Sequence, residues 1–223
     1  MQREASLREG PEARPVTLRA EDAAGLECCL QSGGVAVFPA DTVYGLGCDP
    51  GNERAVRRLY ELKGRPADRP AAVMFFDRER AVGALPELTR AERRAIEALL
   101  PGPVTLLLPN RRCRFPLAGG PTAEGRALLG LRVPLLADSL AALHAVSVPM
   151  MQSSANLSGG PEARRLADVP GELQRGADLV LDGGELPGTA STIVDLSDYE
   201  LTGAFAVVRE GALALTEVER ALG

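Results

Sequence analysis

Lys63, in the segment YELKGRPADRP, is the one lysine of a chain whose other cationic side chains are arginines. A site shaped around a compact ammonium does not accept a planar guanidinium, so the retention of this lysine points to a specific site. Arg65 follows closely, and the flanking Gly64 and Pro66 favour an irregular turn that aims both cations into one cavity. The segment predicts an anion-binding site; ordinary surface charge is the alternative.

Two polar loops carry further candidate ligands. FPADTVYGLGCDP places Asp41, Thr42 and Tyr44 beside glycines after a strand predicted at 34–38. MQSSANLSGGP ends another strand, and its Ser154 and Asn156 offer hydroxyl and amide groups suited to phosphate or ribose oxygens. A plain Asn/Ser/Gly turn is the alternative for either loop. The P-loop and G-x-G-x-x-G patterns do not occur, so an ordinary P-loop or Rossmann site is not expected.

Cysteine and histidine positions argue against metal and triad chemistry. None of the spacings among Cys28, Cys29, Cys48 and Cys113 forms a C-x-x-C pair, so reduced thiols are expected. The sole histidine, His144, lies in a predicted amphipathic helix, where a solvated or packed residue is the simpler interpretation. We therefore expect neither a zinc site nor a Ser-His-Asp triad, and no metal held by protein side chains.

The composition sets the class of protein. The chain has 223 residues, 45% of them hydrophobic and 25% charged, and no apolar run approaches the about 20 residues of a membrane span. We expect a cytoplasmic protein with a flexible leader at 1–15 and a single domain at 16–223. The net charge of −5 argues against a general nucleic-acid coat, although NRRCRF at 110–115 leaves open a weak contact with RNA.

Short apolar runs alternate with helical patterns, which predicts an α/β architecture. Strands are expected at 34–39, 71–76, 104–109, 129–134, 148–154, 178–184, 191–196 and 204–211. Helices are expected at 20–31, 52–63, 89–100, 137–145 and 216–221. The Gly/Pro-rich connection between Pro109 and Gly130 is too long for a routine turn, so it is either a mobile lid or a disordered insert.

The ordered set of motifs resembles the YrdC family of L-threonylcarbamoyladenylate synthases. In sequence order these motifs are PADTVYGLGCDP, LYELKGRPADRP, LPGPVTLLLP, LRVP, SSANLSGGP, STIVDL and VVREGAL. The family signature pairs K-x-R with S-x-N, which fall here on Lys63 with Arg65 and on Ser154 with Asn156. The resemblance implies a twisted open mixed sheet with flanking helices and a deep positively charged cavity.

The resemblance also implies the reaction. L-threonine, bicarbonate and ATP would give threonylcarbamoyl-AMP and pyrophosphate, with Mg²⁺ bound to ATP; tRNA threonylcarbamoyl transferase proteins would then use the product. Catalysis would rest on Lys63 and Arg65. By the same resemblance, the residues that bind ATP are Lys63, Arg65, Ser154, Asn156 and Arg209, and those that bind threonine are Thr42, Arg132 and Ser191. We expect replacement of Lys63 to slow turnover with little change in thermal stability.

Alternatives remain open at this point. Arg132 could instead form an ion pair at a sheet edge, and Ser191 could be an ordinary strand residue. A related domain of the same fold makes carbamoyl-adenylate from carbamoyl phosphate, although it belongs to larger proteins with zinc-binding cysteine clusters. A non-catalytic RNA-binding or ribosome-maturation protein is the third interpretation, disfavoured by the acidic net charge and the few aromatic residues.

Overall fold

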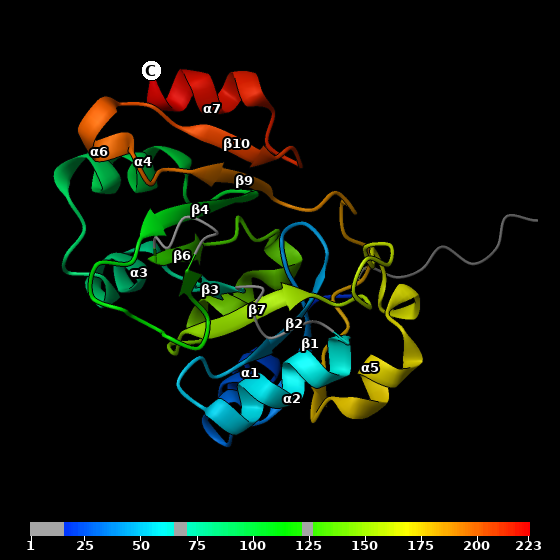
Figure 1. Cartoon of the computed structure of the whole chain (residues 1–223). Coiled ribbons are helices and arrows are strands. Elements are labelled where there is room, and N and C mark those ends of the chain that lie inside the picture. The colour runs from blue at the N-terminus through cyan, green and yellow to red at the C-terminus, as the bar shows by residue number, and fades with distance from the viewer. Residues whose placement is uncertain (1–15, 65–70, 122–126) are drawn as a thin grey trace, which may run out of the picture.

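The computed structural model describes residues 16–64, 71–121 and 127–223 (Figure 1). The strands are β1 (Val35–Pro39), β2 (Tyr44–Cys48), β3 (Ala72–Met74), β4 (Val104–Pro109), β5 (Gly120–Pro121), β6 (Ala127–Arg132), β7 (Met150–Ser154), β8 (Leu179–Val180), β9 (Thr192–Asp195) and β10 (Ala206–Arg209). The α-helices are α1 (Ala20–Gln31), α2 (Glu53–Lys63), α3 (Arg78–Ala84), α4 (Arg90–Leu99), α5 (Gly171–Gly176), α6 (Tyr199–Thr202) and α7 (Leu215–Leu222). The short 3-10 helices are η1 (Asp138–Ala145) and η2 (Leu166–Asp168).

The strands form one mixed sheet in the order β10-β9-β4-β6-β3-β7-β2-β1-β8, and β5 pairs with β6 beside this path. β1 with β8, β3 with β6, and β4 with β9 are parallel pairs. The other neighbouring pairs are antiparallel. Because β10 and β8 lie at opposite ends of this order, the sheet is open. The predicted open mixed sheet with flanking helices is confirmed; the positive charge of its cavity stays a prediction.

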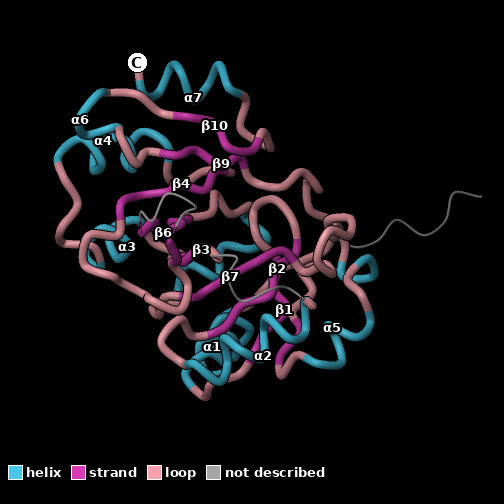
Figure 2. Tube along the Cα trace, viewed as in Figure 1, coloured by secondary structure: helices cyan, strands magenta, loops and turns pink. Residues whose placement is uncertain are grey.

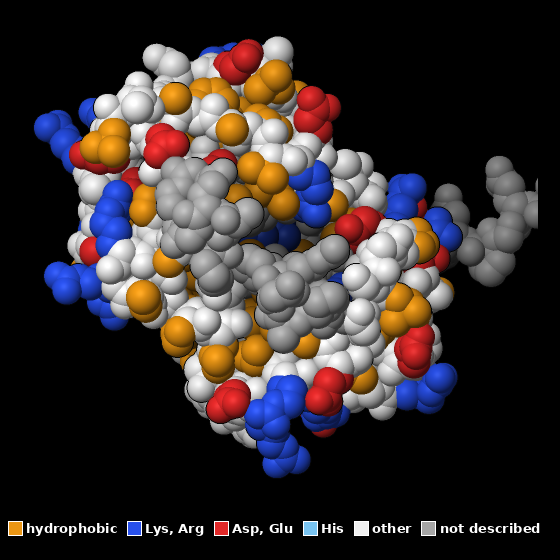
Figure 3. All heavy atoms as spheres, viewed as in Figure 1, with side chains coloured by type: hydrophobic (Ala, Val, Ile, Leu, Met, Phe, Trp, Pro, Cys, Tyr) orange, Lys and Arg blue, Asp and Glu red, His pale blue; other side chains and the backbone are white. Residues whose placement is uncertain are grey.

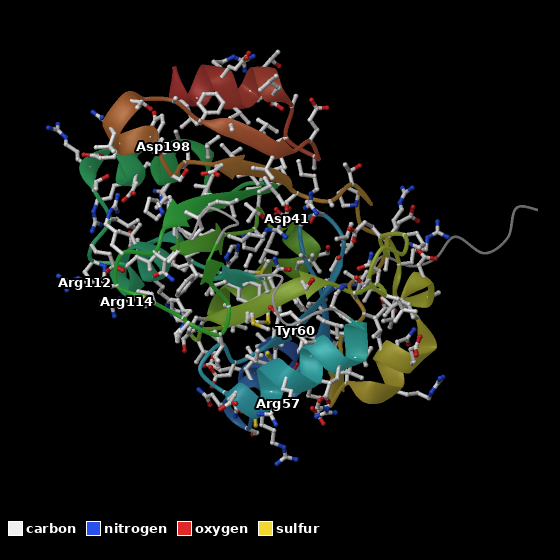
Figure 4. All side chains as sticks on the ribbon, viewed as in Figure 1. Asp41, Arg57, Tyr60, Arg112, Arg114 and Asp198 are labelled. Atoms are coloured by element: carbon white, nitrogen blue, oxygen red, sulfur yellow. The ribbon has the colours of Figure 1, made fainter. Side chains whose placement is uncertain are left out.

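The helices lie toward the two ends of the sheet. α1 and α5 contact β1, and α2 contacts β2, whereas α4 contacts α6 and α7 near the β9–β10 end (Figure 1). Strands β3, β6 and β7 cross the middle of the same view, with loops beside them (Figure 2). None of the helices in the described ranges has the length and apolar character needed to cross a bilayer. The loops in the middle include the β1–β2 turn, on which Asp41 lies (Figure 4).

Local capping fixes where α2 starts and stops. The Asn52 side chain accepts a hydrogen bond from the Ala55 amide at 3.1 Å, so it caps the helix N-terminus. Gly64 ends the helix in the left-handed conformation with φ of 57°, which glycine adopts without the steric cost of a Cβ. Lys63 is therefore the last helical residue, directly before a sharp change of chain direction.

All eight predicted strands and all five predicted helices occur, with differences at their ends. The predicted amphipathic helix at 137–145 is instead the 3-10 helix η1, and the ring of His144 lies 2.8 Å from the Phe76 carbonyl oxygen. Three short α-helices, α3, α5 and α6, were not predicted. All four cysteines are free thiols, as expected. The leader predicted at 1–15 lies outside the described residues, and the single-domain boundary stays a prediction.

β2 was missed because its sequence, YGLGC, was interpreted as part of a polar loop. Every residue of this strand is buried. A Cβ on Gly45 would lie 2.7 Å from the Phe38 ring, and one on Gly47 would lie 2.7 Å from Cγ of Met150. The two glycines thus allow close packing of neighbouring strands and do not mark a turn.

The described part of the connection between Pro109 and Gly130 is ordered by hydrogen bonds. Asn110 accepts from the Arg114 amide at 2.7 Å and donates to the Arg114 carbonyl oxygen at 2.8 Å. β5 then pairs with β6. A disordered insert is therefore the wrong description of this part; residues 122–126 lie outside the described residues.

The basic run NRRCRF is partly neutralised. Arg111 forms an ion pair with the buried Glu92 at 2.9 Å, and Arg114 lies 3.4 Å from Glu87. Each pair places a carboxylate beside a guanidinium that would otherwise be available to phosphate. The positive charge that this run offers to a polyanion is thus smaller than its sequence suggests, and contact with RNA stays a prediction.

Gly211→Ala is expected to destabilise the fold next to β9. The added Cβ would lie 2.6 Å from both the Ser191 carbonyl carbon and the Thr192 amide nitrogen, which are backbone atoms that cannot rotate away. We expect a loss of about 1–3 kcal/mol in the free energy of unfolding, measured by urea denaturation. Gly25→Ala, where a Cβ meets nothing within 4 Å in helix α1, is the control and should be neutral or stabilising. Equal stability of the two variants would contradict this packing argument.

Candidate functional site

The Lys63 side chain binds the loop that comes after β7. Lys63 is 2% exposed, and its Nζ donates to the backbone oxygen of Ser154, to the backbone oxygen of Asn156 at 2.8 Å and to Asn156 Oδ1 at 3.0 Å. The Ser158 amide donates back to the Lys63 carbonyl oxygen at 3.1 Å. An ammonium carries three hydrogens, and three oxygens of one loop accept from it here. The structure thus brings together Lys63, Ser154 and Asn156 through direct hydrogen bonds; their assignment to ATP binding stays a prediction.

Asn156 organises the rest of this loop. Its Oδ1 accepts from Ser154 Oγ at 2.7 Å as well as from Lys63, and its Nδ2 donates to the Gly160 carbonyl oxygen at 2.6 Å. Asn156 is itself buried, at 7% exposure. The alternative of a plain Asn/Ser/Gly turn does not describe these contacts, because both ends of the Asn156 amide are used to fix the loop around one cation.

The contacts of Lys63 alter one expectation. Removing a buried charged donor leaves its acceptors without a partner, which costs more than removing a surface charge. The expectation that Lys63 can be replaced with little change in stability does not fit a residue that is buried and bonded to three oxygens. In this structure a phosphate oxygen could reach the ammonium only by taking the place of one of these acceptors.

A second cluster surrounds Arg132, the last residue of β6. Its Nη2 lies 2.5 Å from Asp41 Oδ1 and 3.4 Å from Thr42 Oγ1, and the second carboxylate oxygen of Asp41 accepts from the Leu135 amide at 3.1 Å. The Arg132 and Asp41 side chains are only 4% and 2% exposed. Arg132 therefore does form an ion pair, as one of its two interpretations from the sequence had it. Thr42 lies in the same cluster.

Burial shapes the electrostatics of this pair. It lowers the pKa of Arg132 and raises the pKa of Asp41, while the attraction between the two groups opposes both shifts. Arg209 also lowers the pKa of Arg132, so the two guanidinium groups lie near enough to repel each other. Among the residues that the structure describes, none accepts a hydrogen bond from the buried Nε–H of Arg132. A buried donor without an acceptor is unfavourable unless a ligand supplies one.

Ser191 and Arg209 form the neighbouring wall. Arg209, on the edge strand β10, donates from Nη2 to the Ser191 carbonyl oxygen at 2.7 Å and to Ser191 Oγ at 3.3 Å. Ser191 Oγ lies 2.9 Å from Thr105 Oγ1 on β4. Ser191 lies directly before β9 rather than within it, and it links the exposed Arg209 to the buried hydroxyl of Thr105; its role in binding threonine stays a prediction.

The β1–β2 turn, residues 40–43, connects the two clusters. Asp41 reaches Arg132, and the carbonyl oxygen of Tyr44 accepts from the amide of Ala155, which lies between Ser154 and Asn156, at 2.8 Å. From Asp41 to Tyr44 the chain spans at most about 10 Å. The Lys63 cluster and the Arg132 cluster therefore lie on either side of one short turn. Figure 3 shows basic side chains at a hollow in the middle of this face.

Comparisons with known proteins identify the family to which the chain belongs. A family model described as "Sua5_yciO_yrdC: Telomere recombination" matches residues 28–211. The chain belongs to the Sua5/YciO/YrdC family. The threonylcarbamoyl-AMP synthase of Pyrococcus abyssi is 30% identical over 87% of this chain and 55% of its own length. That of Thiobacillus denitrificans is 36% identical over 81% of this chain and 94% of its own length.

The solved structures give the same fold. The crystal structure of P. abyssi Sua5 complexed with L-threonine has a TM-score of 0.78 and 28% identity, covering 92% of this chain and 58% of that chain. The chain thus spans little more than half the length of the P. abyssi proteins it matches. Belonging to the Sua5/YciO/YrdC family confirms the resemblance drawn from the motifs.

Some candidate site residues were missed from the sequence, and one predicted residue lies outside the structure. Asp41 was noted as polar but given no role, and Thr105 was taken only as a strand residue. Glu162, close after the Asn156 loop, has one buried carboxylate oxygen without a partner. A charged residue two positions after the fully buried β1 was the available signal for Asp41. Arg65, predicted as the second catalytic cation, is outside the described residues.

Lys63→Met is expected to lower stability even without ligand. Methionine keeps most of the side-chain volume but leaves the acceptors on Ser154 and Asn156 without their cation, so we expect a loss of about 1–3 kcal/mol in urea denaturation. Arg57→Met, on the same helix with a side chain that is 66% exposed, is the control and should stay within about 0.5 kcal/mol of the parent. If Lys63→Met were as stable as the parent, the ammonium would not be holding the loop.

Proposed function

We propose that this protein makes threonylcarbamoyl-AMP from L-threonine, bicarbonate and ATP and releases pyrophosphate. The observation that carries the proposal is the pairing of two clusters across one turn, one built around a buried ammonium and the other around a buried guanidinium with an unused donor. The first suits the phosphates of a nucleotide, and the second suits a carboxylate. The names of the relatives support the same reaction.

The chemistry requires both clusters to act on one reaction centre. Bicarbonate takes up a proton and loses water to give CO2. The threonine amine attacks the carbon of CO2, and the nitrogen then loses a proton to give the carbamate, which balances the proton taken up by bicarbonate. A carbamate oxygen then attacks the α-phosphorus of ATP, and the bond from that phosphorus to the pyrophosphate oxygen breaks. Negative charge grows on phosphate oxygens, so fixed cations are the main catalytic resource.

On the nucleotide side we assign the phosphates to Lys63, with one loop oxygen giving way to a phosphate oxygen as ATP binds. Ser154 and Asn156 would contact phosphate and ribose, and Arg209, which is exposed beside Ser191, would approach the nucleotide from β10. Arg65 would supply a second cation.

On the amino-acid side we assign the threonine carboxylate to Arg132, whose Nε–H lacks an acceptor. Thr42 and Ser191 would meet the remaining polar atoms of threonine. Carboxylate oxygens match the spacing of guanidinium donors, which makes Arg the natural partner here.

Mg²⁺ is assigned to the substrate complex with ATP. Within the described residues, no three His, Cys, Asp or Glu side chains converge in an arrangement that could hold a metal ion. Mg²⁺ is commonly bound through substrate phosphates with few protein ligands. It would lower the charge of the triphosphate, while Lys63 and Arg209 would orient the nucleotide.

The proposed product needs a second protein to use it. A carbamoyl-phosphate anhydride is reactive and hydrolyses in water, so a transferase must consume it nearby. We infer that tRNA threonylcarbamoyl transferase proteins consume the product. Their tRNA substrate is cytoplasmic, so we propose that this protein also acts in the cytoplasm.

Pyrophosphate release should require threonine and bicarbonate together, because the nucleophile is made from both. The measurement is pyrophosphate release by the purified protein with ATP and Mg²⁺, with the acyl-adenylate identified by mass. Release with carbamoyl phosphate in place of threonine and bicarbonate would support the carbamoyl-adenylate alternative. Absence of release under every condition, together with RNA binding, would support a non-catalytic role.

Lys63→Arg should reduce turnover on the order of a hundredfold, as expected when one preorganised donor is lost. A planar guanidinium does not fit three oxygens arranged around an ammonium, so the loop carrying Ser154 and Asn156 must move. The measurement is pyrophosphate release per folded molecule, with folding followed by circular dichroism. Arg57→Lys, at the exposed side of α2, is the control for the reverse exchange and should retain full turnover. Near-normal turnover of Lys63→Arg would contradict the assigned role.

A further inference from the structure

The contacts of Arg132 are unevenly distributed over its guanidinium. Asp41 and Thr42 both accept from Nη2, whereas the buried Nε–H has no partner. A guanidinium carries five N–H donors, and a hydrogen that already donates to a protein oxygen is not available to a ligand. Asp41 therefore uses donors of Nη2, while the Nε–H donor stays unused.

Asp41 is itself held from two sides. One oxygen meets Arg132 and the other accepts from the Leu135 amide at 3.1 Å, just beyond the end of β6. The carboxylate thus bridges the β1–β2 turn and the chain after β6. A long Arg side chain loses considerable rotamer entropy when a ligand orders it, so a guanidinium fixed in advance binds that ligand more tightly.

The same carboxylate sets the charge of the cluster. Asp41 and Arg209 are the charged groups that act on Arg132 in the described structure. With Asp41 ionised, one net positive charge remains for a ligand. One charge matches a single carboxylate, whereas two neighbouring guanidinium groups without Asp41 would favour a phosphate.

We propose that Asp41 is a positioning residue for the amino-acid substrate: it holds Nη2 of Arg132 so that Nε–H faces the carboxylate, and it makes the cluster select a carboxylate over phosphate. This inference rests on the proposed function, since it assigns a role within the same site. Asp41 acts through Arg132 and does not touch the reacting atoms.

The test compares Asp41→Asn with Asp178→Asn. Asp178 is a matched control outside the site, because it too accepts from one arginine, Arg58 at 2.5 Å, and from one backbone amide, Val35 at 2.8 Å. We expect Asp41→Asn to raise the threonine KM about tenfold or more, with kcat and the ATP KM within about twofold of the parent. Inorganic phosphate should become an inhibitor competitive with threonine. Asp178→Asn should produce neither effect.

A double-mutant cycle with Arg132→Lys separates positioning from general destabilisation. If Asp41 acts through the guanidinium, Asp41→Asn should add less than about twofold to the threonine KM of Arg132→Lys. Independent, multiplicative effects would overturn the proposal. So would an unchanged threonine KM in Asp41→Asn, or equal increases in both KM values.

Asp41→Glu keeps the inference testable if Asp41→Asn does not fold. The longer side chain retains the charge but displaces Nη2, so the threonine KM should rise at least about threefold without phosphate inhibition; an unchanged KM overturns the proposal. If the parent protein showed no threonine-dependent pyrophosphate release, the proposed function itself would be contradicted. If the parent were fully active and the Asp41 variants had the same threonine KM, only the role of Asp41 would be contradicted.

Discussion

The buried ammonium of Lys63 is the interaction on which the nucleotide side of the site depends. A charge removed from water must be surrounded by acceptors, and here the oxygens come from the loop after β7. The end of α2 and the conformation of that loop are therefore coupled. An ammonium directs its donors tetrahedrally, whereas a guanidinium directs them in a plane, so three converging oxygens select lysine. This accounts for one lysine in a chain that otherwise uses arginine.

The short β1–β2 turn extends this constraint to the amino-acid side. It is bonded at Tyr44 to the Ala155 amide and at Asp41 to Arg132. The Lys63 loop and the Arg132 cluster are therefore linked through hydrogen bonds only a few residues apart in the chain. The proposed reaction needs this proximity, because a carbamate formed on bound threonine must reach the α-phosphorus of ATP. If the two clusters lay on loops without contacts between them, the carbamate oxygen and the α-phosphorus would not be held in position for the attack.

The sequence predicted those parts of the fold that local patterns encode. The bounds of α1 and β4 follow from hydrophobic periodicity and flanking Gly or Pro, and both were found as predicted. β2 was missed because its glycines are required by Phe38 and Met150, which come from neighbouring strands. The ion pair of Arg132 with Asp41 is equally non-local. No periodicity in the chain indicates that a residue at 41 meets one at 132.

Arg132 illustrates why its two interpretations from the sequence are compatible. An ion pair at a sheet edge and a carboxylate-binding residue were set against each other, as though one guanidinium could serve only one partner. The structure gives Nη2 to Asp41 and leaves Nε without an acceptor, so the structural contact and the unused donor lie on the same side chain. A buried arginine whose donors were all used would have to release an acceptor before it bound a substrate, and one with no partner would be costly to bury. Asp41 stabilises the buried charge of Arg132 by accepting from Nη2. Because it leaves Nε–H unused, this donor remains available to a ligand.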